Sequence, residues 1–255
     1  MCKAGSKVFM AFGDVHIPHQ NPRAVDVFCR AAELIRPSLI VCLGDLLDCG
    51  QFSFHPPTFG MPETEYEDDL RQANALLDRL QKSCDRLVLI EGNHEHRLDR
   101  WAAATAEGRG AYSMLAPRLQ LSKGRSRFTY IRYGSVDGTY PHYKLNSRIV
   151  AVHGWSYARH ATKAHLQMSQ GRSVIHGHTH RCDASIIQNV WGAGTVQARS
   201  AGCLCKQIPL YGTGSPVEWV NAFLLGFMGR RSDTLYTIPI MGDRCILSDG
   251  TEVAA

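Results

Sequence analysis

The chain has 255 residues, of which 44% are hydrophobic and 20% are charged, an ordinary balance for a globular protein with a sizeable core. Its formal net charge of +5 fits an anionic substrate and fits equally well a surface that is merely charged for solubility. No apolar run of about 18 residues predicts a membrane span, and the apolar stretch after Lys7 is too short for a secretion signal, so we expect neither.

The first hundred residues alternate predicted strands and helices. Apolar runs predict three buried strands, at 7–12, 39–43 and 86–90. Asn21 and Pro22 predict the cap and first turn of a helix that ends before Pro37. A second helix is expected over about 63–84, where leucines recur at helical spacing. This alternation predicts an α/β fold in which ligands gather beyond the carboxyl ends of the strands.

The rest of the chain predicts a different pattern. A segment around 98–123 is expected to be helical and to cover one side of the site. Beyond it we expect a helix at about 158–169 and strands at 128–133, 144–152, 173–176, 221–227, 234–240 and 245–247. A second sheet facing the first is the simplest way to bury the strands after Phe128, so we predict a four-layer α/β/β/α sandwich of two facing mixed sheets. Without a linker or repeat, residues 1–255 are expected to form a single domain.

Five short motifs place an Asp, Asn or His beside a glycine, and four of them follow an apolar run. They are Gly13-Asp14-Val15-His16, Gly44-Asp45-Leu46-Leu47-Asp48, Gly92-Asn93-His94-Glu95, Val152-His153-Gly154 and Gly177-His178-Thr179-His180. The glycines suit tight turns at strand ends, where backbone and ligand approach closely. Two carboxylates, one amide and four imidazoles half-fill two octahedral shells and leave positions for water and substrate. The pattern therefore indicates two divalent metal ions at strand ends.

In the order of these motifs, D-x-H, G-D-x-x-D, G-N-H-[E/D], H and G-H-x-H, the chain resembles the calcineurin-like metallophosphoesterase superfamily. The resemblance spans residues 13–180. It implies that one metal ion is held by Asp14, His16 and His180. It implies a second ion held by Asn93, His153 and His178, with Asp45 as the bridge. A water or hydroxide between the metal ions would then be the nucleophile.

The resemblance also implies catalytic roles for two residues that are not ligands. His94 would act at the leaving-group oxygen as a general acid or charge stabiliser. Asp48 would orient a ligand or hold His94 in position. Two further residues are candidates for substrate contact. Arg97 either binds a phosphate oxygen or forms a surface ion pair, and His19 either reaches the phosphate or caps its loop.

The identity of the substrate is less constrained than the chemistry. Serine/threonine protein phosphatases carry an arginine where this chain has Cys49-Gly50, which argues against that activity. The His16-Ile17-Pro18 continuation is similar to compact bacterial and bacteriophage phosphoesterases grouped with DNA-repair exonucleases. Too few residues follow His180 for a full capping domain beyond the second sheet. We therefore expect hydrolysis of a phosphodiester in a nucleotide or a single-stranded nucleic acid. The alternatives are a broad-specificity phosphomonoesterase and a catalytically silent metal-binding scaffold.

The mixed donor set accepts several metals; Mn²⁺ is expected first, with Fe, Zn, Ni or Mg as alternatives. Nine cysteines, an odd number with several in apolar runs, predict reduced thiols and a cytoplasmic protein. The oligomeric state stays open.

Four groups of residues near the motifs have competing interpretations. The aromatics Phe52, Phe54, Phe59 and Tyr66 either stack a base or pack internally. The cations Lys123, Arg125, Arg127 and Arg132 either steer a polyanion or are solvated. His160 and His165 are expected to be solvated, and Cys203 and Cys205 to be ordinary thiols.

Overall fold

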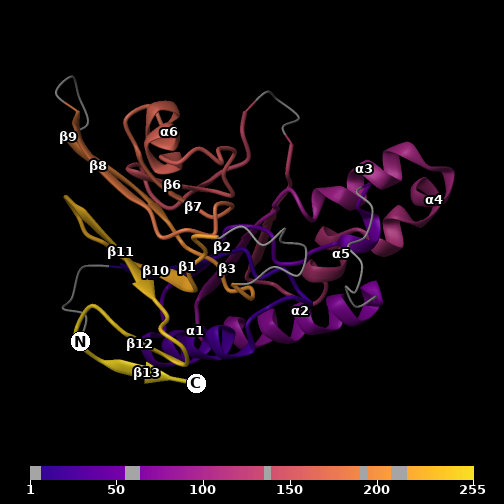
Figure 1. The fold of residues 1–255 in the computed structure, drawn as a ribbon, viewed down its shortest axis with the longest axis horizontal. Coiled ribbons are helices and arrows are strands. Elements are labelled where there is room, and N and C mark those ends of the chain that lie inside the picture. Colours follow the sequence, from indigo (N-terminus) through magenta and orange to yellow (C-terminus); the bar gives the residue numbers. More distant parts are fainter. Residues whose placement is uncertain (1–6, 55–63, 135–138, 190–193, 208–216) are drawn as a thin grey trace.

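The computed structural model describes residues 7–54, 64–134, 139–189, 194–207 and 217–255 (Figure 1). In these residues the larger sheet has six strands in the order β11-β10-β1-β2-β3-β4. Their bounds are β1 Lys7–Phe12, β2 Leu39–Cys42, β3 Arg86–Ile90, β4 Phe128–Ile131, β10 Ala222–Met228 and β11 Asp233–Pro239. The strands β1 to β4 run parallel, whereas β10 and β11 extend the sheet in antiparallel fashion beside β1. The first three predicted strands are therefore confirmed as neighbours in one sheet.

A second sheet in the described residues has five strands in the order β5-β6-β7-β9-β8. Their bounds are β5 Tyr143–Lys144, β6 Ile149–Val152, β7 Ser173–His176, β8 Ala184–Asn189 and β9 Gly194–Ser200. The single strand predicted at 144–152 is thus two antiparallel strands joined by a turn. The sequence did not predict β8 or β9. Edge strand β8 leaves Ile186 and Ile187 largely exposed, so it lacks the one-sided apolar pattern that identifies a strand.

The helices complete the layers. They are α1 Pro22–Ile35, α2 Tyr66–Gln81, α3 His96–Ala104, α4 Ala106–Leu115, α5 Pro117–Ser122 and α6 Ala161–Met168, with a short 3₁₀ turn at Gly50–Phe52. Asn21 caps α1 by accepting hydrogen bonds from the backbone of Arg23 and Ala24, as its sequence predicts. The helical segment expected around 98–123 is confirmed as α3, α4 and α5. No helix in the described part of the chain is both long and apolar enough to cross a membrane.

Successive side chains of a strand point to opposite faces of the sheet, and this alternation explains the order of the layers. In β1, Met10 and Phe12 join the cluster that includes Phe28 of α1 and Leu77 of α2. The intervening Phe9 and Ala11 join a second cluster with side chains of β6 and β7, between the two sheets. On the outer face of the second sheet, side chains of β6, β7 and β9 pack against Leu166 of α6. The predicted four-layer α/β/β/α sandwich is confirmed.

The expectation that every strand after Phe128 belongs to the second sheet was wrong. Strand β4 pairs with β3, and β10 pairs with β1, so both edges of the parallel core are extended by later segments. Strand β10 is apolar on both faces, because Leu224 faces the second sheet and Leu225 faces α1. A strand with two apolar faces fits the middle of this sheet. The last strands, β12 Arg244–Ile246 and the unpredicted β13 Glu252–Ala254, form a separate pair that contacts α1.

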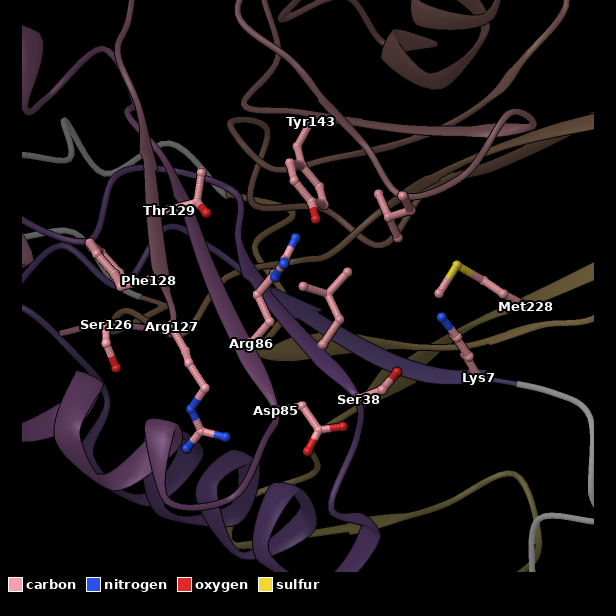
Figure 2. A pocket seen from close by; sticks show the side chains of 12 residues that line it. Lys7, Ser38, Asp85, Arg86, Ser126, Arg127, Phe128, Thr129, Tyr143 and Met228 are labelled. Atoms are coloured by element: carbon pink, nitrogen blue, oxygen red, sulfur yellow. The ribbon is translucent and has the colours of Figure 1, made fainter.

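A hollow of about 630 Å³ opens at the amino ends of β1 to β4, where Lys7, Arg86 and Tyr143 lie around it (Figure 2). None of the residues implicated by the motifs lines this hollow. Those residues follow the carboxyl ends of the strands, at the opposite edge of the sheet. The motifs and the hollow therefore mark two different ends of the sandwich.

The contact between Gly226 of β10 and Phe9 of β1 supplies a test of this packing. A Cβ at position 226 would lie 2.2 Å from Cε1 of the Phe9 ring, which is fully buried. Gly226→Ala should therefore lower the free energy of unfolding by about 1–3 kcal/mol, measured by urea denaturation. Gly110→Ala in α4 is the matched control, since its Cβ meets no described atom within 4 Å. It should leave stability unchanged or raise it by up to about 1 kcal/mol. Equal stability of the two variants would contradict the packing described here.

Candidate metal centre

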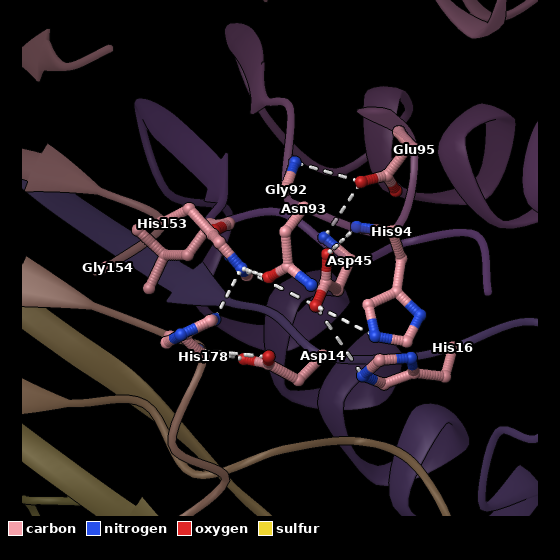
Figure 3. A network of polar contacts seen from close by, with 12 residues as sticks. Asp14, His16, Asp45, Gly92, Asn93, His94, Glu95, His153, Gly154 and His178 are labelled. Carbon is pink, nitrogen blue, oxygen red and sulfur yellow. Dashed lines mark hydrogen bonds and ion pairs between the residues drawn. The ribbon is translucent and has the colours of Figure 1, made fainter. Parts of the chain in front are cut away.

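The motif residues follow the carboxyl ends of strands that meet at one edge of the sandwich. Asp14 and His16 follow β1, Asp45 follows β2, Asn93 follows β3, His153 follows β6, and His178 and His180 follow β7. Strands β1 to β3 are parallel in one sheet, and β6 and β7 are parallel in the other. The structure therefore brings together all seven side chains that the sequence singled out as ligands. Figure 3 labels six of them, all but His180, with Asp45 in the middle of the group.

Five of these seven residues have a left-handed backbone. The φ angles are 53° at Asp14, 50° at His16, 50° at Asp45, 70° at His178 and 58° at His180. This region is uncommon for residues other than glycine and costs of order 1–3 kcal/mol at each position. Hydrogen bonds between the loops hold these conformations. The backbone N–H of Asp14 donates to Gly44 O at 3.0 Å, and that of His16 donates to Asp45 O at 2.9 Å.

Two of the adjacent glycines are required by close approach. A Cβ at Gly92 would lie 2.0 Å from Asp45 Oδ1, and a Cβ at Gly177 would lie 2.4 Å from Asp14 Oδ2. Any side chain at either position would displace a carboxylate from the centre. The predicted reason for glycine beside the ligands is confirmed at both positions.

Both carboxylates are buried and directed by backbone N–H groups. Asp14 is 0% exposed, and the N–H of His178 donates to both of its oxygens at 2.9 Å. Asp45 is 2% exposed, and its Oδ1 accepts from the N–H of His94 at 2.9 Å. Its Oδ2 stays directed into the centre, 3.4 Å from His153 Nε2 and 3.8 Å from His16 Nε2. Burial alone would raise the pKa of Asp45, but the surrounding imidazoles hold it well below its usual value, so this carboxylate is charged.

The imidazole nitrogens face one another across the centre. His16 Nε2 lies 3.1 Å from His180 Nε2, and His178 Nδ1 lies 3.0 Å from His153 Nε2. The candidate ligands include two groups whose donor atoms all lie within 4.8 Å of one another. One group is Asp14, His16 and His180, and the other is Asp45, His153 and His178. Burial, together with the charge of His153, lowers the pKa of His178 to about 4, which keeps its lone pair available. Carboxylate oxygens and imidazole nitrogens that converge in this way are a donor set that fits divalent ions.

The remaining nitrogens of three histidines have partners outside the centre. His153 Nδ1–H donates to Leu43 O at 2.8 Å, and His16 Nδ1 lies 3.1 Å from Asp48 Oδ1. His180 Nδ1 lies 3.8 Å from the buried Sγ of Cys205. Such partners fix the ring orientation of a ligand histidine. The sequence predicted an ordinary thiol at Cys205 and gave no signal of this contact, since the two residues are 25 positions apart.

His94 and Arg97 lie together at the edge of the centre. His94 Nδ1 is 3.0 Å from the same Asp48 Oδ1 that contacts His16, so one oxygen orients both rings. Arg97 donates from NH1 to Asp48 O at 2.9 Å, and its NH2 lies 3.2 Å from His94 Nε2. Arg97 also forms an ion pair with Asp48, with NH1 3.5 Å from Oδ2, so the ion pair considered from the sequence is present but lies beside His94 and is partly buried. For His19 the described hydrogen bonds involve only its backbone, with Lys206 and His16 as partners.

Several residues near the motifs serve the fold. Phe52 and Tyr66 are buried, with ring centroids 4.9 Å apart, so the suggestion that they stack a base is wrong. Phe54 is exposed beneath Arg100, and Phe59 lies outside the described residues. Of the basic cluster, Arg125 bonds Asn74 and Asp78, and Arg132 bonds Asp99. His165 was expected to be solvated but is buried, and it stacks on His176 with centroids 4.1 Å apart.

The aromatic rings that do reach the centre were not identified from the sequence. The ring of Tyr157 lies 3.9 Å from that of His178, and the ring of Trp219 lies 4.2 Å from that of His180, centroid to centroid. Both residues stand in connecting segments without an apolar period, so only their spatial contacts associate them with the motifs.

Glu95 joins the loops that carry the candidate ligands. It is 0% exposed. Its Oε2 accepts from the N–H groups of Asp45 at 3.1 Å and Gly92 at 2.9 Å, and its Oε1 accepts from Leu47 at 2.8 Å. A carboxylate satisfies all three donors at once, whereas an amide has only one oxygen.

Glu95→Gln should therefore weaken the site without removing any proposed ligand. The amide nitrogen would face a backbone N–H, which should cost about 1–3 kcal/mol of folding stability. Displacement of the Asp45 loop should lower the affinity for Mn²⁺ at least tenfold, measured by isothermal titration calorimetry. Glu107→Gln, on the exposed first turn of α4, is the control and should leave affinity unchanged. Wild-type affinity in Glu95→Gln would refute the role given to these three hydrogen bonds.

Comparisons with known proteins identify the family. The family model for calcineurin-like phosphoesterase matches residues 7–182. A search of curated proteins found no match to this sequence. Among solved structures, a Vps29 mutant from Entamoeba histolytica is 14% identical, with 97% of each chain covered and a TM-score of 0.49. Vps29 from Chaetomium thermophilum is 16% identical, with 98% of this chain and 93% of that chain covered and a TM-score of 0.47. The phosphoesterase YfcE from E. coli is 15% identical, with 97% of each chain covered and a TM-score of 0.40.

These structural likenesses are too distant to bear on activity. The family match is broader, because it spans all five motifs and every strand that precedes them. Members of the family bind divalent metal ions, and this chain carries candidate clusters for them at the expected strand ends. The chain belongs to the calcineurin-like metallophosphoesterases.

Proposed function

We propose that this protein is a dinuclear metal-dependent phosphoesterase that hydrolyses a phosphodiester in a nucleotide or a nucleic acid. The observation that carries the proposal is the position of Asp45. Its Oδ2 lies between donors from the two sheets, with His153 on one side and His16 on the other. A charged, buried carboxylate oxygen between two donor groups is suited to bridge two cations.

The donor groups suggest how two ions are divided. The first is assigned to Asp14, His16 and His180, whose ligand atoms form one group. The second is assigned to His153 and His178, together with Asn93, whose Oδ1 lies 2.8 Å from His153 Nε2. Asp45 completes both sets. Mn²⁺ is the proposed ion, because the mixed oxygen and imidazole donors suit it and leave room for substrate oxygens.

Two divalent ions bound by these residues would supply Lewis-acid polarisation of the phosphoryl group and would activate water as the nucleophile. The protein contributes a leaving-group catalyst. His94 directs Nδ1 to Asp48, and its Nε2 lies 3.2 Å from Arg97 NH2 and 3.9 Å from Asp45 Oδ2. Protonated at Nε2, His94 can donate its proton to the departing oxygen. Asp48 keeps the ring in this orientation while it also holds His16.

Arg97 supports a substrate with one negative phosphate charge. Its guanidinium lies beside His94, and NH1 is anchored on Asp48 O at 2.9 Å, so the cation is held at the edge of the centre. One fixed guanidinium matches the single charge of a diester. His19 stays a weaker candidate for substrate contact, since its loop is adjacent to His16. From the sequence we also propose that the protein is cytoplasmic and that its partner is a nucleotide or a single-stranded nucleic acid.

His94→Ala tests the assigned catalyst. It should lower turnover by about two orders of magnitude or more, because a lost acid or charge stabiliser costs that much. Metal content, measured by inductively coupled plasma mass spectrometry, should match the wild type. His160→Ala, an exposed histidine before α6, is the matched control and should retain full turnover. Turnover that survives in His94→Ala would exclude the role of His94.

The choice between diester and monoester is tested by a direct comparison. With Mn²⁺ added, the protein should hydrolyse bis-p-nitrophenyl phosphate with a higher kcat/KM than p-nitrophenyl phosphate, since one fixed guanidinium matches one charge. A preference for the monoester would replace the proposal with a phosphatase. Two bound metal ions per chain without turnover of either ester would indicate a silent scaffold.

A further inference from the structure

Tyr157 is the most exposed aromatic ring that contacts the metal centre. It lies between β6, whose end carries His153, and α6. Its ring centroid is 3.9 Å from that of His178 at an interplanar angle of 43°, yet the residue is 69% exposed. Most of the ring surface is therefore accessible to a flat partner. Its exposed surface is beside a proposed metal ligand.

The loop that carries Tyr157 is held from several directions. The Tyr140 hydroxyl donates to Gly154 O at 2.6 Å, and the N–H of Trp155 donates to His165 Nε2 at 3.2 Å. The Trp155 ring packs between these two residues, 4.8 Å from Tyr140 and 4.2 Å from His165. Beyond Tyr157, Arg181 NH2 donates to Ala158 O at 2.6 Å.

Such bracing sets the ring in place before a ligand arrives. A side chain that is already ordered loses little conformational entropy when a ligand binds. An exposed tyrosine held in this way can therefore bind a flat partner more tightly than a mobile one. The loop bonds described above lie on both sides of residue 157 and involve neighbouring backbone groups, so they fix the loop while the ring stays exposed.

We propose that Tyr157 forms a stacking subsite for the base of a nucleotide whose phosphate lies at the metal centre. This inference rests on the proposed function and deepens it. A nucleotide places a planar ring a few bonds from its phosphate, and Tyr157 is adjacent to His178 in the proposed ligand set. Stacking needs no hydrogen-bond readout, so the subsite accepts different bases. The aromatic residues suggested from the sequence do not compete for this role, because Phe52 and Tyr66 are buried.

The test measures binding and does not depend on turnover. Protein loaded with Mn²⁺ and carrying His94→Ala, which suppresses hydrolysis, is titrated calorimetrically with AMP and with ribose 5-phosphate, which lacks the base. AMP should bind about 5- to 150-fold more tightly, the range that base–aromatic stacking supplies. Adding Tyr157→Ala should reduce AMP binding to the level of ribose 5-phosphate, whereas Tyr157→Phe should retain the difference.

Two controls separate stacking from support of His178. Bound Mn²⁺ should be equal in all variants, and Tyr236→Ala, which removes a partly exposed tyrosine on β11, should change neither affinity. If AMP and ribose 5-phosphate bind alike, or if neither binds, the proposal is wrong. If Tyr157→Ala weakens both ligands equally or releases Mn²⁺, the ring serves the metal ligand instead. If the protein with Tyr157 intact shows no base preference while the wild type hydrolyses the diester, this subsite alone is wrong. If it shows the base preference but the wild type hydrolyses no diester, only the proposed reaction is wrong.

Discussion

The buried charge of Asp45 is the group on which the arrangement of the site depends. An uncompensated carboxylate at 2% exposure is costly, so its surroundings must supply both hydrogen bonds and opposite charge. The N–H of His94 and the imidazoles of His16 and His153 meet that need. The N–H of Asp45 donates to Glu95, and the carbonyl oxygen of Asp45 accepts hydrogen bonds from backbone N–H groups of the loop after β1. These bonds hold the loops after β1, β2 and β3 together. Asp45 also joins the loops to the second sheet through its contact with His153.

The core formed by the two sheets offsets the free-energy cost of the site. Ligand residues with left-handed backbones and buried charges are unfavourable by themselves, and they persist only where the rest of the fold determines their positions. The cluster between the sheets, which includes Val41, Ile90 and Ile175, sets the distance between the ligands of the first sheet and those of the second. Dense packing there allows little adjustment, so the donor atoms on both sides stay within a few ångströms of one another.

Strands buried on both faces were the easiest part of the fold to predict. The bounds expected at 7–12 and 86–90 agree with β1 and β3, because parallel strands covered on both sides appear in the sequence as continuous apolar runs. Edge strand β8 escaped prediction, since its consecutive isoleucines, Ile186 and Ile187, are exposed on opposite faces and its pattern matches neither period. The sheet that each late strand joins was also missed, because a strand's sequence indicates how deeply it is buried but not which neighbour it pairs with.

By itself the sequence determined which residues are candidate ligands, their order and their position after strands, because each candidate stands within a few residues of the turn that holds it. Only the tertiary structure decided which atoms meet. The sharing of one Asp48 oxygen by His16 and His94, the thiol of Cys205 behind His180, and the exposed ring of Tyr157 over His178 join residues 21 to 46 positions apart. Contacts of that range depend on strand register and on the path of each loop. Those are consequences of how two sheets pack, and no local pattern of residues encodes them.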